Sequence, residues 1–419
     1  MAGPGGARQA DVLVRGELVA EVGPDAAAGA SGRARVLDAA GCIVAPGLVD
    51  LHAHLREPGG EEAETVATAS RAAALGGFTA VVAMPNTEPP ADSAAVVRHV
   101  QQLAKGALCD VYPAGTITVG RQGRTLAAMA EMAALGVRIF SDDGAGVQDA
   151  ALMRRALECA SALGVVIADH CEEASLAGAG CINEGAVSSR LGLVGRPPVS
   201  EEVMVLRDLA LARATGGRLH LLHLSTGAAV AAVRQAKANG VAVTAEVTPH
   251  HLALTEDALS GCDPLFKVNP PLRSEADRLA VLAGVADGTI DAIATDHAPH
   301  PAKAKQVALS EAAPGMLGLE TALAVVMHGL GLDLDRVLAV LSRQPARIAG
   351  LAGTHGGPVE AGAAANLCVI DPARRWTVRP ELLASRSRNT PFAGRELVGK
   401  VRHTLLAGEP VVCDEEAQR

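Results

Sequence analysis

Aromatic side chains are nearly absent from this sequence, which has one Trp, one Tyr and four Phe among its 419 residues. A hydrophobic fraction of 49% nevertheless allows a large core, which must be built from Ala, Val and Leu. The net charge is −9, and no stretch of basic residues is present that could follow a phosphate backbone. The sequence therefore argues against a disordered chain and against a nucleic-acid-binding protein.

Long apolar runs are also missing. No run reaches the roughly 18 residues that a membrane span needs, and the segment from Met1 to Asp11 lacks the apolar stretch of a secretory signal. The eight cysteines are scattered singly from Cys42 to Cys413, without a CxxC pair, which is typical of reduced thiols. We therefore expect a cytoplasmic protein with no membrane partner and no nucleic-acid partner.

The sequence does contain a repeated alternation of short β-branched runs with Ala- and Leu-rich helical stretches. The expected strands are Ile43–Val49, Thr79–Ala83, Val111–Thr118, Val137–Phe140, Val165–Ala168, Arg218–Leu222, Val241–Val247 and Ile290–Ala294. The expected helices include Glu61–Leu75, Thr125–Leu135, Ala150–Leu163, Glu201–Thr215 and Ala228–Asn239. Eight strands alternating with helices predict an α/β fold, a TIM-type (β/α)8 barrel. Periodicity alone leaves a doubly wound sheet open.

The two ends of the chain have a different pattern, with short strand-like pieces separated by turn residues. These pieces are Ala10–Val14, Leu18–Val22, Ala365–Ile370 and Val401–Leu406. They predict a small β domain built from both termini. The expected division is residues 1–44 and 356–419 for the small β domain and residues 45–355 for the barrel.

Polar residues follow the predicted strands where each strand ends. His52 and His54 stand two residues apart, which places both side chains on one face of a strand. The other candidates after strand ends are Asp143, His170, His223 and Asp296. Because the carboxyl ends of barrel strands meet at one mouth, where active sites lie, we expect the six side chains to converge. A single histidine at a strand end is weak evidence, whereas six such residues in order are strong evidence.

Four imidazoles and two carboxylates suit a borderline divalent metal such as Zn2+. Six ligands are more than one tetrahedral ion needs, so we expect two zinc ions bridged by a carboxylate and a hydroxide. Asp143 is the candidate bridge, and its neighbour Asp142 is the competing choice. None of the six lysines lies near the end of the fourth strand.

Several motifs give the chain a resemblance to a known family. Asp50–Gly59 (DLHAHLREPG) and Ala294–His300 (ATDHAPH) resemble the two signatures of dihydroorotases. Further similar stretches are Met84–Thr87, Asp169–Glu172, His223–Thr226, Thr248–His251 and Lys267–Arg273. The resemblance runs from about Asp11 to the C-terminus. An aspartate at the place where many relatives have a carboxylated lysine is similar to the class I bacterial type.

The resemblance implies a zinc-dependent, reversible cyclisation of N-carbamoyl-L-aspartate to L-dihydroorotate in de novo pyrimidine (UMP) biosynthesis. The positions that match the family's metal ligands are His52, His54, Asp143, His170, His223 and Asp296. Asp296 also matches the catalytic acid/base. The positions that match substrate contacts are His54, then Arg56, Asn86 and His300 around the carboxylate, and Asn269, Pro314 and Gly315 around the ring.

These roles lead to a mechanistic hypothesis. In hydrolysis, the bridging hydroxide attacks the ring amide carbonyl, which the metals polarise. Asp296 accepts the hydroxide proton and delivers it to the leaving nitrogen. A guanidinium such as that of Arg56 suits the substrate's carboxylate because it can donate two parallel hydrogen bonds.

Two other functions remain as alternatives. A related cyclic amidase would act on hydantoin, allantoin or dihydropyrimidines, but Arg56, Asn86 and His300 favour a substrate with a carboxylate. A silent homologue would serve as a structural partner of aspartate transcarbamoylase, but such relatives typically lack metal histidines, and none is missing here. The sequence leaves open a homodimer and a complex with aspartate transcarbamoylase.

Several residues near the motifs have simpler interpretations. His297, next to Asp296, is expected to support the ligands rather than bind metal. His250 and His251 are expected to pack or hydrogen-bond, and Cys171 is expected to be a small buried thiol. The segment from Ala302 to Ala313 is predicted to be a loop over the site, and Pro314 stands where the family commonly has Phe.

Overall fold

The computed structural model describes residues 2–3, 6–7, 9–32 and 34–418. Eight parallel strands form its centre, in two sheets of three and five strands. In chain order they are β6 (Leu48–Ala53), β7 (Phe78–Ala83), β8 (Asp110–Pro113), β9 (Ile139–Phe140), β10 (Val166–Asp169), β13 (Arg218–Leu221), β14 (Val243–Val247) and β15 (Ala292–Ile293). Parallel bridges Gly115–Phe140 and Ala53–His297 join the two sheets into a closed barrel. The barrel prediction is confirmed, and the doubly wound alternative is wrong.

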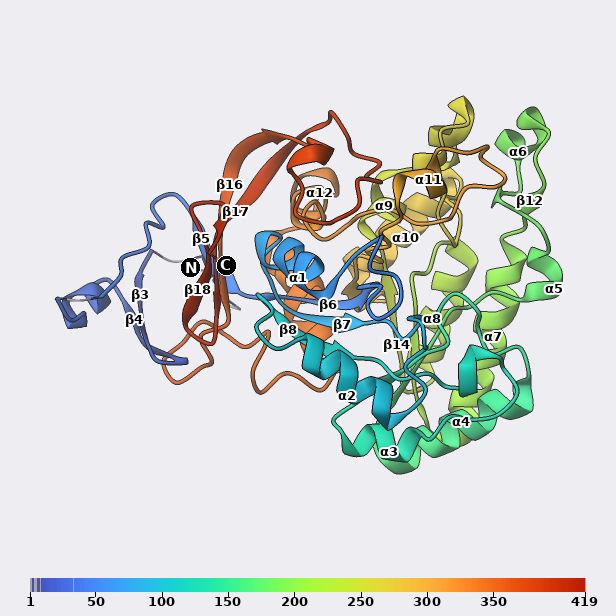
Figure 1. Cartoon of the computed structure of the whole chain (residues 1–419), viewed down its shortest axis with the longest axis horizontal. Coiled ribbons are helices and arrows are strands. Elements are labelled where there is room, and N and C mark those ends of the chain that lie inside the picture. The colour runs from blue at the N-terminus through green and yellow to red at the C-terminus, as the bar shows by residue number, and fades with distance from the viewer. Residues whose placement is uncertain (1, 4–5, 8, 33, 419) are drawn as a thin grey trace.

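Helices surround the barrel (Figure 1). The longer ones are α1 (Val66–Leu75), α2 (Ala94–Leu103), α4 (Ala150–Leu163), α7 (Val199–Thr215), α8 (Gly227–Ala238), α10 (Glu275–Asp287) and α12 (Ala322–Gly329). The shorter ones are α3 (Met129–Ala134), α5 (Ala174–Ala177), α6 (Ala186–Leu191), α9 (Pro249–Ala253), α11 (Ala302–Lys305), α13 (Leu334–Leu338) and α14 (Gln344–Ile348). The segment predicted as a loop from Ala302 thus begins with one helical turn. No helix among the described residues is long and apolar enough to cross a membrane.

Local chemistry explains where these elements begin and end. All residues of β6 and β7 are buried, as expected for strands that are covered on both faces. Thr65 accepts a hydrogen bond from the Thr68 amide and so caps α1, while Asp149 caps α4 in the same way. Gly164 ends α4 in the left-handed conformation, where a glycine avoids strain.

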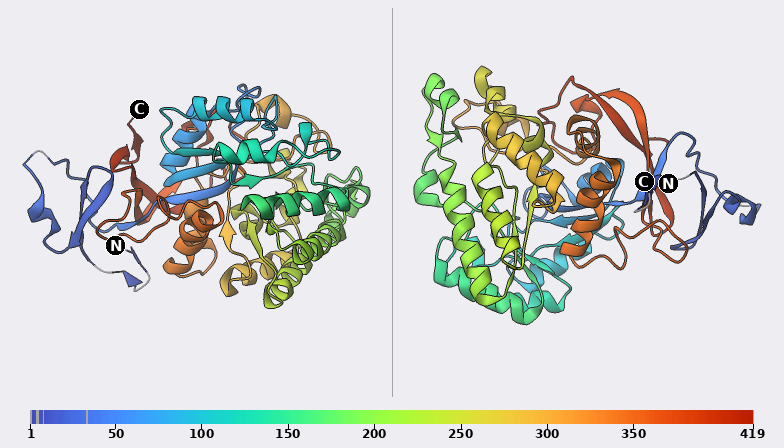
Figure 2. Two further views of the ribbon diagram at one scale, coloured as in Figure 1. Left: turned by 90° about the horizontal axis from the view of Figure 1, so that it is seen from below. Right: turned by 180° about the vertical axis from the view of Figure 1, so that it is seen from behind.

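The small β domain combines both ends of the chain. Its main sheet has the order β19-β18-β17-β16-β5, formed by β5 (Ile43–Pro46), β16 (Leu367–Thr377), β17 (Glu396–Leu406), β18 (Glu409–Cys413) and β19 (Glu416–Ala417). The hairpin of β3 (Asp11–Arg15) and β4 (Leu18–Gly23) joins it through the bridge Leu18–Ala364. The remaining two-stranded pairs are β1 (Ala2–Gly3) with β2 (Gly6–Ala7) and β11 (Ile182–Asn183) with β12 (Gly195–Arg196). Figure 2 shows this domain at one end of the molecule, beside the barrel.

The prediction of a single strand over Ile43–Val49 was wrong, because the structure has two strands there. The first half of this range is β5 of the small sheet, and its second half begins the barrel strand β6. Gly47 separates them where a Cβ atom would lie 2.2 Å from Thr79 Oγ1, so a side chain does not fit. The predicted boundary between residues 44 and 45 falls within β5, and the proposed division into domains stays a prediction.

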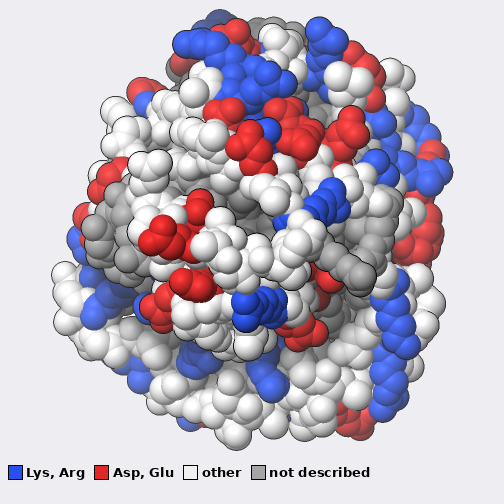
Figure 3. Space-filling model, turned by 90° about the vertical axis from the view of Figure 1, so that its left-hand side faces the viewer, with Lys and Arg blue, Asp and Glu red and all other residues white. Residues whose placement is uncertain are grey.

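Figure 3 shows the end of the molecule that carries the small β domain. Basic and acidic side chains are interspersed on this face among the described residues. The described residues on this face therefore form no continuous basic surface of the kind that binds a phosphate backbone.

Candidate metal centre

The six predicted ligands converge at the carboxyl ends of the barrel strands. His52 lies in β6 and His54 directly follows it, while the other four follow β9, β10, β13 and β15. All six are buried, with at most 5% of their surface exposed. The sequence order of the strands therefore delivers the whole set to one mouth, as in other barrels of this type.

The Asp143 carboxylate lies between two pairs of histidines. Its Oδ2 is 3.5 Å from His52 Nε2 and 3.4 Å from His54 Nε2. Its Oδ1 is 3.6 Å from His170 Nδ1 and 3.5 Å from His223 Nε2. Each carboxylate oxygen thus faces a different pair of imidazoles, which is the arrangement that a carboxylate between two cations requires.

Asp296 lies on the side of the first pair. Its Oδ1 is 3.1 Å from His54 Nε2 and 3.6 Å from His52 Nε2. Two groups offer ligand atoms within 4.8 Å of one another: His52, Asp143 and His223, and His52, His54 and Asp296. Burial alone would raise the pKa of Asp296, but the neighbouring histidines outweigh burial and hold its pKa below the usual range.

Two buried atoms in this cluster, His52 Nε2 and Asp143 Oδ1, have no hydrogen-bond partner among the described residues. Buried polar atoms are almost always paired, because leaving one unpaired costs about 1 to 3 kcal/mol. A divalent cation between the imidazoles and carboxylates would satisfy both atoms. The residues present therefore fit a metal site.

Asp142, the competing candidate for the bridge, hydrogen-bonds to a neighbouring loop and does not face the histidines. Its Oδ1 accepts hydrogen bonds from the amides of Ile117 at 2.9 Å and Thr118 at 3.1 Å, and its Oδ2 accepts one from the Thr118 hydroxyl. The carboxylate thus fixes the loop after β8, and only Asp143 faces the histidines.

Glu246 in β14 is a site residue that the sequence analysis missed. Its fully buried carboxylate accepts hydrogen bonds from His52 Nδ1 at 2.8 Å and from His220 Nε2 at 3.0 Å. Burial alone would raise the pKa of Glu246, but these two histidines lower it to about 2. The available sign was an acidic residue inside a largely buried strand, because a buried charge needs a partner. Glu246 holds the His52 ring so that Nε2 points at the cluster.

Of the neighbouring histidines, His297 and His251 have the supporting contacts that were expected, whereas the buried His250 Nε2 has no hydrogen-bond partner among the described residues. His297 Nε2 is 3.3 Å from Glu64 Oε2, and its backbone carbonyl accepts from the His54 amide at 2.8 Å. His251 Nε2 donates to the Pro270 carbonyl at 3.0 Å. Burial lowers the pKa of His250 to about 4, so it is neutral at pH 7.

A third group of ligand-type atoms, Asp169, Cys171 and Asp208, lies beside the centre. Arg207 lies 2.7 Å from the Asp208 carboxylate and 3.8 Å from that of Asp169, so a cation is already present there. Burial raises the pKa of the Cys171 thiol well above its usual value, as expected for a small buried thiol.

The predicted carboxylate contacts lie together beside the metal cluster. Arg56 donates through Nε to the Pro299 carbonyl at 3.1 Å, and one terminal guanidinium nitrogen is 3.4 Å from His300 Nε2. Asn86 Oδ1 is 2.8 Å from His54 Nδ1. Burial and the Arg56 cation lower the pKa of His300 to about 3, so His300 is neutral and donates to the Pro314 carbonyl at 2.8 Å.

The predicted ring contacts border the same space. Asn269 Nδ2 is 3.2 Å from His170 Nε2, and its Oδ1 accepts from Arg196, which the sequence analysis did not identify. Gly315 has a φ of 135°, and a Cβ there would lie 2.9 Å from His300 Nε2. The glycine therefore lets the backbone approach the carboxylate contacts. A cavity of about 210 Å³ adjoins, and its lining includes Arg196, Asn269 and Pro314.

Comparisons with known proteins agree with this geometry. The model of the dihydro-orotase-like family matches residues 41–229. The chain is 50% identical over 417 residues to a dihydroorotase of Streptomyces coelicolor, covering 98% of this chain and 96% of that relative. It is 52% identical over 393 residues to a dihydroorotase of Anaeromyxobacter dehalogenans, covering 92% and 90%.

Solved structures share the fold over almost the whole chain. An L-hydantoinase (dihydropyrimidinase) from Arthrobacter aurescens superposes with a TM-score of 0.88 at 25% identity, covering 99% of this chain and 94% of that one. A dihydropyrimidinase from Brevibacillus agri superposes with a TM-score of 0.85 at 22% identity, covering 98% and 93%. With a 50% identical relative matched over nearly its full length and a buried cluster of histidines and aspartates at the barrel mouth, the chain belongs to the dihydroorotase family of amidohydrolases.

Proposed function

We propose that this enzyme is a zinc-dependent dihydroorotase that interconverts N-carbamoyl-L-aspartate and L-dihydroorotate in de novo pyrimidine (UMP) biosynthesis. The observation that carries the proposal is the position of the Asp143 carboxylate. Its Oδ2 faces His52 and His54, and its Oδ1 faces His170 and His223. The names of the relatives support the same activity.

Two zinc ions would be held by His52, His54, Asp143, His170, His223 and Asp296, with Asp143 shared between them. Imidazole and carboxylate ligands suit zinc, and six ligands suit two ions better than one. Bound zinc supplies an ionised water at neutral pH and polarises an amide carbonyl.

Asp296 carries the proton in this proposal. Its carboxylate is at the edge of the cluster, 3.1 Å from His54 Nε2, and a carboxylate beside bound cations is ionised at neutral pH. An ionised carboxylate at this point accepts a proton from the attacking water and returns it to the ring nitrogen as the amide bond breaks. Cyclisation uses the same steps in reverse.

Arg56 provides the charge that selects the substrate. His300 is neutral and already donates to the Pro314 carbonyl, so the guanidinium is the cation of the predicted clamp. A guanidinium grips a carboxylate through paired hydrogen bonds, with Asn86 beside it. Asn269 and the backbone at Pro314 and Gly315 face the ring. An anionic substrate is therefore favoured over the neutral rings suggested by the hydantoinase names of structural neighbours.

Replacing Asp296 by Asn tests the proposal. The amide oxygen of Asn can still contact a metal, but it cannot take up a proton. We expect most metal to be retained, while turnover of L-dihydroorotate falls about 10²- to 10⁴-fold. Metal content by elemental analysis and a spectrophotometric assay give the two readouts. Turnover near that of the wild type would remove Asp296 from the role of proton carrier.

The remaining expectations concern location and assembly. The eight cysteines are free, which is consistent with a cytoplasmic enzyme. A homodimer and a complex with aspartate transcarbamoylase both remain compatible with activity, and light scattering with and without that partner would distinguish them.

A further inference from the structure

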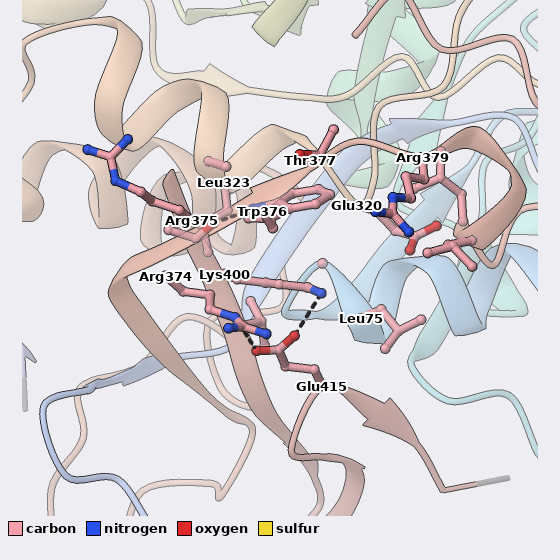
Figure 4. A pocket seen from close by; sticks show the side chains of 16 residues that line it. Leu75, Glu320, Leu323, Arg374, Arg375, Trp376, Thr377, Arg379, Lys400 and Glu415 are labelled. Atoms are coloured by element: carbon pink, nitrogen blue, oxygen red, sulfur yellow. Dashed lines mark hydrogen bonds and ion pairs between the residues drawn. The ribbon is translucent and has the colours of Figure 1, made fainter. Parts of the chain in front are cut away.

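A separate cavity lies at the junction of the barrel and the small β domain (Figure 4). Its volume is about 330 Å³, within the range of small-molecule pockets. Its walls come from the end of α1, the start of α12, strands β16 and β17, and the segment after β16. Its lining contains none of the predicted metal ligands or substrate contacts, so a ligand here would be independent of the metal centre.

Cationic side chains dominate the charge of this cavity. The lining contains four cations, Arg374, Arg375, Arg379 and Lys400, and two carboxylates, Glu320 and Glu415. Arg375 is paired with Glu396 at 2.7 Å, so Arg374, Arg379 and Lys400 are the cations that count in the cavity. Glu415 is shared, because it lies 2.9 Å from Arg374 Nε and 2.8 Å from Lys400 Nζ. Because one carboxylate, that of Glu415, faces two cations, this side of the cavity has an excess of positive charge.

Arg379 is not engaged at all by the residues that the structure describes: its guanidinium has neither a hydrogen bond nor an ion pair among them. Figure 4 shows Arg379 across the cavity from Arg374 and Lys400. Because this guanidinium is exposed, has no ion pair to break and faces two further cations, pairing it with an incoming anion costs little free energy.

Glu320 offsets this charge only in part at neutral pH. Its Oε1 accepts a hydrogen bond from the Ala384 amide at 2.8 Å. Burial raises the pKa of Glu320 to about 7, so the carboxyl group is partly protonated under physiological conditions.

One wall of the cavity is apolar. Trp376 donates through Nε1 to the Gly399 carbonyl at 3.0 Å, which fixes its ring, and Lys400 Nζ lies 5.2 Å from the ring centroid. Leu323 lines the same space, and Leu382 is 70% exposed at its rim. A fixed indole and exposed leucine offer a surface for a planar, weakly polar group.

We propose that this cavity binds a small phosphorylated ligand that carries a planar ring, of the nucleoside monophosphate type. Arg374, Arg379 and Lys400 surround the phosphate, which guanidinium groups can hold through paired hydrogen bonds. The ring occupies the wall formed by Trp376, Leu323 and Leu382.

The sequence provides a direct probe, because Trp376 is the single tryptophan of the chain. Adenosine 5′-monophosphate, uridine 5′-monophosphate and inorganic phosphate are each titrated into the metal-loaded enzyme at constant ionic strength, with excitation at the red edge of tryptophan absorption. We expect a saturable change with a Kd of about 1 mM or lower for a nucleotide, and weaker binding of phosphate alone.

Variants separate the cavity from other surfaces. Arg379→Ala should weaken nucleotide binding about tenfold or more, and Arg379→Lys should weaken it less, because lysine keeps the charge but loses the paired hydrogen bonds. Arg213→Ala, which changes an exposed arginine of α7 in the barrel, is the matched control and should bind as the wild type does.

Two results would overturn the proposal. One is the absence of saturation by fluorescence and by calorimetry up to about 10 mM of each probe, ten times the expected Kd. The other is nucleotide binding that Arg379→Ala leaves unchanged. Phosphate binding as tight as nucleotide binding would refute the role assigned to the apolar wall.

Discussion

Replacing Glu246 by Gln isolates the contribution of a carboxylate that touches a predicted ligand without being one. In the folded protein this carboxylate accepts from His52 Nδ1 at 2.8 Å and from His220 Nε2 at 3.0 Å, and it is fully buried. A glutamine keeps the size of the side chain and one acceptor oxygen, but removes the charge that makes His52 a better ligand. His220 can still bond to the Thr244 hydroxyl, 2.7 Å from its Nδ1.

The size of the effect follows from these contacts. Removing a partner of this kind typically lowers metal affinity about 10- to 100-fold, or about 1.4 to 2.8 kcal/mol. Glu246→Ala should be worse, because two buried N–H donors lose their acceptor at a cost of about 1 to 3 kcal/mol each. That cost falls on folding as well as on metal binding.

Competition with a chromophoric chelator measures the zinc affinity of Glu246→Gln, and urea unfolding of the metal-free proteins shows whether the fold itself has changed. Glu158→Gln, at an exposed position of α4, is the matched control and should equal the wild type. Wild-type zinc affinity in Glu246→Gln would refute the claim that the carboxylate tunes His52.

Three further predictions follow from individual contacts. Asp143→Asn should lose more than about a hundredfold in zinc affinity. Asp142→Asn should keep its metal but lose about 1 to 3 kcal/mol of unfolding free energy, because its hydrogen bonds to the loop after β8 are weakened. Elemental analysis and urea unfolding distinguish the two variants. Arg56→Lys should raise KM for L-dihydroorotate about tenfold with a smaller change in kcat, since paired hydrogen bonds are lost, and steady-state kinetics would contradict this if only kcat fell. Burial raises the folded-state pKa of Glu320 to about 7, so protonation stabilises the native state and that stability is lost as pH rises towards 7. Between pH 5 and pH 8 the free energy of unfolding of the wild type should fall by about 2 kcal/mol more than that of Glu320→Gln. An equal change in the urea curves of both proteins would show the reasoning to be wrong.

The barrel and its six strand-end residues could be predicted because both depend on local patterns. Short β-branched runs with helices between them leave few ways to cover a parallel sheet, and the closed barrel brings every strand end to one mouth. The strands β10 and β13 and the histidines that follow them, His170 and His223, illustrate this directly.

Contacts between distant segments could not be predicted in the same way. The run around Gly47 looked like one strand because β5 and β6 are both apolar, and only the close approach of Thr79 shows why the chain must break there. Glu246 and Arg196 were missed because their roles depend on His52 and Asn269, which come from other parts of the chain.

The most direct test of the central claim is an assay of metal-depleted and zinc-reconstituted enzyme on L-dihydroorotate, with hydantoin, allantoin and dihydrouracil run in parallel. We expect turnover of L-dihydroorotate alone, restored by zinc and abolished by chelator. Turnover of a neutral ring in its place would contradict the carboxylate clamp of Arg56, Asn86 and His300, and folded, zinc-loaded protein without any turnover would contradict the proposed activity itself.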